Sequence, residues 1–285
     1  MNRRLAFGLL GLALLLATAG CSTVLGPGEA SPEDLAAEES YAWNQSADAY
    51  LDVNEENVTG VYRVAARSTG ETNADDPTIE IYTRDTLGTE QPETVSAVRF
   101  RYPNGTLVRF RNADGEAVSV VRYPDGETER APDLMRVERT RSRTIIHLPE
   151  NATGRLGVTV PKNGKSVTTP TYVEGSYEMV LPERAEVGVP LLAKVRPGTD
   201  DRDAVDGNVH LYWDELSASS LSVRYYLSRD LLLFGGLAAG ATAIGLAGAG
   251  YYFVQLRETR RKREEVGPDV DIDDDDSRRP PPGMG

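Results

Sequence analysis

Residues 95–110 read VSAVRFRYPNGTLVRF, in which apolar and polar side chains alternate on both sides of a Pro-Asn-Gly turn. Because successive side chains of a strand point to opposite faces, the turn must bring like faces together. A three-residue loop pairs Phe100 with Val108 and Val98 with Phe110, whereas a two-residue Asn-Gly turn would set apolar residues against arginine. We therefore predict a bulged hairpin with the loop glycine at positive φ.

The same matching of faces predicts three more hairpins along the chain. The expected pairs are Phe110 with Val118 and Val108 with Val120 around residues 112–115, Ile146 with Val158 and Leu148 with Leu156 around Asn151, and Trp213 with Leu221, Leu211 with Val223 and Val209 with Tyr225. One apolar and one polar face per strand is typical of antiparallel sheets that cover a core. We therefore predict that residues 41–228 form a mainly β fold, an antiparallel β-sandwich. It is expected to be either one domain or two domains with a break near 161–170.

Composition excludes several classes of site. The 285 residues include 44 Asp and Glu, 31 Lys and Arg, two His and one Cys, with a net charge of −13. One cysteine excludes a disulfide framework and multi-thiolate metal centres, and the acidic balance argues against a nucleic-acid partner. Only four basic residues are Lys, and this surface composition favours a halophilic protein. We predict no metal and no cofactor.

The N-terminus has the pattern of a lipoprotein leader. Arg3-Arg4 precedes an apolar run, Leu5 to Leu16, that is too short to be a preferred membrane span. Small residues then lead into Cys21, so residues 1–20 are interpreted as a signal peptide and Cys21 as the lipidated N-terminus. The alternative is an ordinary signal peptide, and both the general and the twin-arginine export routes stay open. Residues 21–40 are expected to be a flexible tether.

The C-terminal part predicts a membrane anchor. Leu231 to Val254 contains no charged residue, and at about 1.5 Å per residue it is long enough to cross a hydrocarbon core. We predict a transmembrane helix over 229–256, with Tyr225-Tyr226 and Tyr251-Tyr252 as interfacial aromatic residues. Arginines follow at once, which places 257–285, a basic helix and an acidic disordered tail, in the cytoplasm and the β region outside the cell.

Several surface features are candidates for modification or binding. Small residues at helix-contact spacing, Gly236 and Gly240, suggest a helix–helix dimer. Sequons for glycosylation occur at Asn44, Asn57, Asn104 and Asn151. One face of the first hairpin carries the candidate polyanion-binding residues Arg99, Arg101, Arg109 and Arg111. The alternative for these arginines is a solvated face that pairs with the chain's own acids.

No catalytic residue is predicted. His210 and His147 are each expected on an exposed strand face, with His210 opposite Arg224, and no nucleophile motif frames either. Residues 200–207 hint at a calcium loop, but Val205 and Tyr212 stand where an EF-hand needs oxygen ligands. We interpret that run as an acidic loop.

A family resemblance rests on motifs spread over nearly the whole chain. These are the lipobox at Cys21, YAWNQS, YTRDTLGTEQP, RFRYPNGT, TPTYVEGSYEMVLP, VHLYWDELSASSLSVRYYLSRDLLLFGG and the PPPGMG end. The chain resembles a group of haloarchaeal surface lipoproteins with a C-terminal span, which form a domain family of unknown function. The resemblance implies location and implies no activity.

The sequence therefore predicts a non-enzymatic cell-surface lipoprotein, single-pass, with a glycosylated β ectodomain. Two alternatives stay open: a binding module for a polyanion or an envelope protein or glycan, and a hydrolase with an unrecognised site.

Overall fold

The computed structural model describes residues 30–65, 77–85, 87–149 and 153–265. The predicted signal peptide, Cys21, Asn151 and the acidic tail lie outside these residues. The chain divides after Ser228 into two compact units. Among the described residues, the first unit holds nineteen strands and one short helix, and the second holds a single long helix, whose first residue, Ser228, is the last of the first unit.

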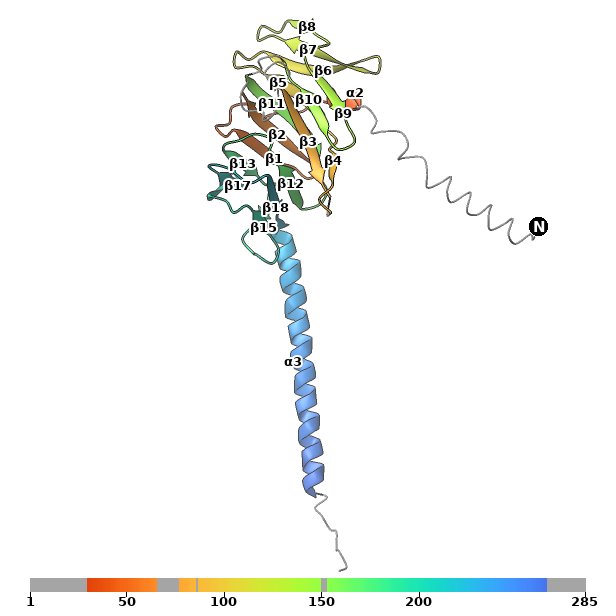
Figure 1. The fold of residues 1–285 in the computed structure, drawn as a ribbon. Coiled ribbons are helices and arrows are strands. Elements are labelled where there is room, and N and C mark those ends of the chain that lie inside the picture. Colours follow the sequence, from red (N-terminus) through yellow and green to blue (C-terminus); the bar gives the residue numbers. More distant parts are fainter. Residues whose placement is uncertain (1–29, 66–76, 86, 150–152, 266–285) are drawn as a thin grey trace, which may run out of the picture. The chain divides into compact units, whose positions relative to one another are not determined.

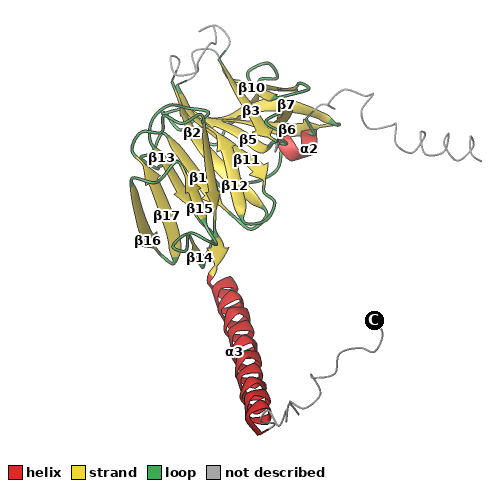
Figure 2. Cartoon of the chain, turned by 60° about the horizontal axis from the view of Figure 1, so that its bottom comes forward, coloured by secondary structure: helices red, strands yellow, loops and turns green. Residues whose placement is uncertain are grey.

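The largest sheet has ten strands in the order β16-β17-β13-β1-β2-β11-β5-β6-β7-β8 (Figures 1 and 2). Their bounds are β1 Ala49–Val53, β2 Asn57–Val64, β5 Ser96–Arg101, β6 Leu107–Ala113, β7 Glu116–Arg122, β8 Thr128–Arg130, β11 Gly154–Pro161, β13 Tyr177–Val180, β16 Asp201–Val205 and β17 Asn208–Trp213. Neighbours are antiparallel except β1 and β13, which are parallel.

Three smaller sheets complete the β unit. The four-stranded sheet has the order β4-β3-β10-β9, the three-stranded sheet β12-β18-β15, and the two-stranded sheet β14-β19. Their bounds are β3 Thr78–Arg84, β4 Glu90–Pro92, β9 Arg136–Arg139, β10 Thr144–His147, β12 Ser166–Pro170, β14 Ala185–Glu186, β15 Lys194–Arg196, β18 Ser220–Arg224 and β19 Tyr226–Leu227. The helices are α2 Pro32–Leu35 and α3 Ser228–Glu265.

One hydrophobic core lies between the large sheet and the smaller ones. Phe100 and Leu156 from the large sheet, Ile81 from the four-stranded sheet, and Val167 and Leu221 from the three-stranded sheet all belong to it. The predicted fold class, mainly β with one C-terminal helix, is confirmed. Because residues on both sides of 161–170 share this core, the β region is one domain.

The first predicted hairpin is confirmed in register and in loop type. Phe100 pairs with Val108, and the loop closes where the Tyr102 amide donates to the Thr106 carbonyl. Three residues lie between these two, and Gly105 has a φ of 89°. The next hairpin differs by one residue: Phe110 pairs with Ser119, not Val118, because Asp114 and Gly115 both take positive φ in a two-residue turn.

The other two predicted hairpins are wrong. β10, with Ile146, pairs with β3 and β9, while β11, with Val158, inserts between β2 and β5 of the large sheet. β17 lies in the large sheet beside β13 and β16, whereas β18 lies in the three-stranded sheet. Each pair of segments therefore faces across the core instead of sharing a sheet edge.

Three local expectations are also corrected. Tyr225 and Tyr226 are buried in the β domain rather than interfacial: the Tyr225 hydroxyl accepts from Lys162 Nζ at 3.0 Å, and the Tyr226 hydroxyl donates to Glu186 at 3.0 Å. The expected acidic loop at 200–207 contains strand β16, which forms a hairpin with β17. The C-terminal half of the expected tether is ordered, as described below.

Candidate functional site

Strand register gathers arginines on the outer face of the large sheet. Arg155 on β11 lies directly opposite both Arg63 on β2 and Arg101 on β5. Two residues along, Arg99 pairs with Arg109 on β6. Like charges directly opposite each other on a sheet are destabilising unless other groups compensate them. Compensating partners must therefore come from outside these strands.

Residues 31–46, which we call the N-terminal strap, supply many of those partners. The strap begins at Ser31, whose hydroxyl caps α2 by accepting from the Asp34 amide at 3.3 Å. Leu35 on α2 is buried in the main core, and α2 contacts β5, β6 and β7 (Figure 2). Residues 31–40 are thus packed against the sheet, which corrects the expected flexible tether over this part.

Glu38 of the strap joins the first two arginines. Its carboxylate lies 3.0 Å from Arg99 Nη2 and 2.8 Å from Arg109 Nη1. The two guanidinium groups hold the pKa of Glu38 below its usual range. Arg99 also donates to the backbone carbonyls of Ala37 and Glu39. These two predicted polyanion-binding residues are therefore engaged within the chain, with 12% and 25% of their side chains exposed.

Two aromatic residues hold the strap on the sheet. The Tyr41 hydroxyl donates to the Ala97 carbonyl at 2.8 Å and lies 2.9 Å from the Thr159 hydroxyl. Burial raises the pKa of Tyr41 above its usual value. Both Tyr41 and Trp43 lie over Gly157, where a Cβ atom would approach their rings to within 3.0 Å. Glycine in β11 therefore makes room for the aromatic part of the strap.

The remaining two predicted arginines have different surroundings. Arg101 lies 6.0 Å from the centre of the Trp43 ring and, among the described residues, has no carboxylate partner. It lines a pocket that also contains Arg63 and Arg155, which the sequence reasoning missed. Arg111 is exposed on β6 and lies outside this pocket.

A second cavity, of about 330 Å³, opens between the large sheet and the smaller ones. Tyr62 and Tyr172 meet in it edge to face with ring centres 5.4 Å apart, and both lie within hydrogen-bonding reach of the Thr169 hydroxyl. Glu93 and Lys162 also line the cavity. Burial raises the pKa of Glu93 above its usual value. The cavity thus offers aromatic edges, hydroxyls and two charged groups.

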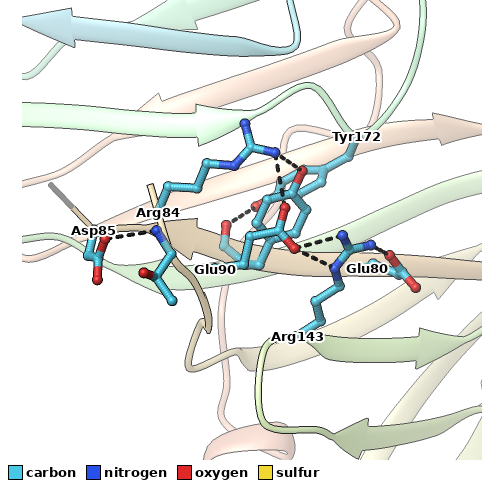
Figure 3. Close-up of polar contacts among 8 residues, drawn as sticks. Glu80, Arg84, Asp85, Glu90, Arg143 and Tyr172 are labelled. Atoms are coloured by element: carbon cyan, nitrogen blue, oxygen red, sulfur yellow. Dashed lines mark hydrogen bonds and ion pairs between the residues drawn. The ribbon is translucent and has the colours of Figure 1, made fainter. Parts of the chain in front are cut away.

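Tyr82, which lines this cavity, is also in contact with an ion-pair cluster of Glu80, Arg84, Glu90 and Arg143; Figure 3 shows these four charged residues. Arg143 donates to Glu80 and, at 2.7 Å, to Glu90, and Arg84 donates to Glu90 at 3.0 Å. Both guanidinium groups lie against the Tyr82 ring, at 4.9 and 5.4 Å from its centre. Every charge of the cluster has a partner of opposite sign, so its role is structural: it joins β3 and β4 to Arg143, the residue before β10.

The histidines are held by carboxylates. His210 Nδ1 lies 2.8 Å from Glu178 Oε1, and both side chains are largely buried on the outer face of the large sheet. His210 lies opposite Val180 and Asp203 rather than Arg224, because β17 and β18 belong to different sheets. Burial raises the pKa of neighbouring Asp52. His147 lies 3.6 Å from Glu138.

Two of the three described sequons, and the apolar part of the long helix, are exposed. Asn44 and Asn104 are exposed and Asn57 is half-buried, with its side chain accepting from Asn54. In the described part of the chain, α3 alone is long and apolar enough to cross a membrane. Gly236 and Gly240 are exposed on it. No group of three metal-ligating side chains is found among the described residues.

Comparison with known proteins places this arrangement in a family. Residues 45–271 match the model of the family of unknown function DUF5803. The chain belongs to this family. The match includes the sandwich from just after Asn44 and the whole of α3, so both units are part of the family's pattern. No curated protein and no solved structure matches the chain.

Proposed function

We propose that this chain is a non-enzymatic surface protein of the cell membrane, whose β domain lies outside the cell and is anchored by α3 and by lipid at Cys21. The observation that carries the proposal is the uncharged segment of α3. It begins within a few residues of the last strand, and arginines follow it from Arg257 onward. Glycans on the exposed sequons Asn44 and Asn104 are part of the proposal.

The non-enzymatic part of the proposal is supported by how the reactive side chains are used. His210 binds Glu178, and the Arg143 cluster is neutralised internally. A hydrolytic triad instead needs a nucleophile hydrogen-bonded to a base. Among the described residues, Glu178 is the hydrogen-bond partner of the His210 ring.

The topology is tested by external protease on intact cells that express the chain with an epitope after Gly285. We expect loss of the β domain and protection of a tagged fragment that starts near Arg229. Removal of the epitope without lysis would reverse the orientation. Mass spectrometry of the mature protein tests the leader, since Cys21 should be the N-terminal residue and carry lipid.

A second candidate function is the binding of an anionic partner by the arginine face, which consists of Arg63, Arg99, Arg101, Arg109 and Arg155 on the outer face of the large sheet. The observation that favours it is the cross-strand row of Arg63, Arg155 and Arg101, which the strap compensates less completely than it does Arg99 and Arg109.

A further inference from the structure

We propose that Arg63, Arg155 and Arg101 form a binding site for a tetrahedral oxyanion, a sulfate or phosphate group carried by a larger ligand. This inference gives the second candidate function a site and a ligand class. It does not depend on how the chain is anchored, because every residue involved belongs to the β domain.

The three arginines line one pocket of about 350 Å³, which we call the arginine pocket. Its other described lining residues include Trp43, Asn44 and Tyr102, and none of the described lining residues is acidic. The three guanidinium groups come from adjacent strands β2, β11 and β5, at positions directly opposite each other. A fixed row of three positive charges is therefore built into the sheet itself.

Compensation inside the chain is incomplete. Asp48 lies 3.1 Å from Arg63 Nη1, and it is the one carboxylate in an ion pair with any of the three among the described residues. Arg63 and Arg155 also donate to the backbone carbonyls of Ser46 and Gln45. Arg155 Nη1 is buried without a hydrogen-bond partner. A buried donor without a partner is costly, and a neighbouring negative charge would offset that cost.

The arrangement fits a tetrahedral oxyanion better than a carboxylate. A carboxylate has two oxygens, which one arginine satisfies in a bidentate pair. A sulfate or phosphate monoester has three terminal oxygens, so it can accept hydrogen bonds from three guanidinium groups at once. The aromatic rings of Trp43 and Tyr102 beside the arginines offer an apolar wall to the group that carries the ester.

The neighbouring pair Arg99 and Arg109 shows how an anion could bind to the row of three arginines in the pocket. Glu38 of the strap bridges Arg99 and Arg109 and occupies the place that an anion would take there. At the arginine pocket the strap supplies carbonyl groups and an indole ring, whereas its residue Glu38 pairs with Arg99 and Arg109 instead. The strap thus neutralises Arg99 and Arg109 with a carboxylate, whereas it contacts the arginines of the pocket without supplying one.

The test uses the full chain in detergent, with inorganic sulfate, inorganic phosphate, acetate and chloride as sodium salts at equal ionic strength. The readouts are the Tm of the β domain and the fluorescence of Trp43, which Trp43→Phe separates from that of buried Trp213. We expect a saturable rise in Tm and a fluorescence change with sulfate and phosphate, and a much weaker response to acetate and chloride.

Arg101→Gln is the decisive variant, because Arg101 makes no ion pair with any described residue whose loss would unfold the domain. We expect it to fold and to bind sulfate or phosphate about tenfold or more weakly. The matched control is Arg111→Gln, which removes one exposed charge from the adjacent strand outside the pocket and should bind as the natural chain does. The general, non-saturating stabilisation by sulfate should remain in both variants.

Equal saturable responses in Arg101→Gln and in the natural chain would overturn the proposal, as would equal responses to all four salts. Glycerol phosphate and glucose 6-sulfate then distinguish the source of the group. Tighter binding of the first than of its inorganic ion points to a phosphate monoester, such as a lipid headgroup with a terminal phosphate, and tighter binding of the second to a sulfated sugar. Failure of these tests leaves the anchoring proposal untouched, because protease protection measures that one separately.

Discussion

Single side chains decide how the strap is fixed to the sheet. Glu38 is 78% exposed, yet it is the group that neutralises two arginines brought together by the β5–β6 register. Exposed ion pairs contribute little to stability, and bridging two cations at once is the geometry in which such a pair contributes most. The effect of Glu38 should therefore be small, local and dependent on pH.

We predict that Glu38→Gln lowers the stability of the strap by less than about 1 kcal/mol. Because the folded pKa of Glu38 lies below its ordinary value of 4.5, its contribution is complete above pH 4.5 and disappears as the pH falls through the lowered folded value. Amide hydrogen exchange of residues 35–43 at pH 7 and at pH 3 measures this. A difference between variant and natural chain that is as large at pH 3 as at pH 7 would contradict the charge mechanism.

A second residue-scale prediction concerns the cavity between the sheets. A Cβ atom on Gly60 would lie 2.7 Å from the ring of buried Tyr62, so Gly60→Ala must displace that ring. We expect a loss of about 1–3 kcal/mol in the free energy of unfolding, measured by chemical denaturation. In a Tyr62→Leu background the same glycine change should cost clearly less, because the ring is gone. Equal costs in both backgrounds would show that the contact is not responsible.

At the scale of elements, the strap contributes Leu35 of α2 to the main core and then packs Tyr41 and Trp43 in a second apolar cluster on the outer face of the large sheet. α2 has four residues, too few to be stable alone. Its position therefore depends on the burial of Leu35 and on the packing of Tyr41 and Trp43 against Gly157. The strap crosses β11 where glycine leaves room and reaches β5 and β6 where arginine attracts it.

We predict that Leu35→Ala loosens the strap without unfolding the sandwich. The change removes buried apolar surface worth about 2 kcal/mol, part of which is recovered when the strap detaches. Limited proteolysis should show faster cleavage within residues 31–46, while the Tm of the sandwich changes little. Ala36→Gly, on a half-buried neighbour, is the control for backbone effects. Cooperative loss of the whole domain would instead show that α2 is part of the folding core.

At the scale of the whole molecule, the β domain and α3 are separate compact units, and their roles are expected to be separable. The core residues of the sandwich all precede Ser228, and the described side chains of the apolar part of α3 are exposed. The membrane, rather than the sandwich, is therefore the environment in which we expect the apolar surface of α3 to be buried.

We predict that a chain ending at Ser228 keeps the Tm and the far-ultraviolet circular dichroism of the β domain. If Cys21 is lipidated, this shortened chain stays with the membrane fraction, and adding Cys21→Ala releases it. Cys21→Ala alone should leave the full chain in the membrane, because a spanning helix is the stronger anchor. Release of the shortened chain while Cys21 is intact would exclude a lipid anchor.

The sequence by itself was sufficient for features that local chemistry dictates. Alternation of apolar and polar residues predicted the β class, the absence of charge over 231–254 predicted the long apolar helix, and Gly105 predicted a three-residue hairpin loop. Each of these features depends on residues that are close together in the sequence. Alternation of side chains sets the two faces of a strand, an uncharged run makes a helix suitable for a membrane, and a glycine allows the positive φ of a turn.

Only the tertiary structure decided which strands are neighbours and which charges meet. Every strand of a sandwich carries an apolar face, so matching faces cannot distinguish a partner in the same sheet from one in the facing sheet; the β10–β11 and β17–β18 expectations failed for this reason. Arg63, Arg101 and Arg155 are likewise ordinary polar-face residues of their own strands. They become a row of like charge because β11, distant in sequence, inserts between β2 and β5.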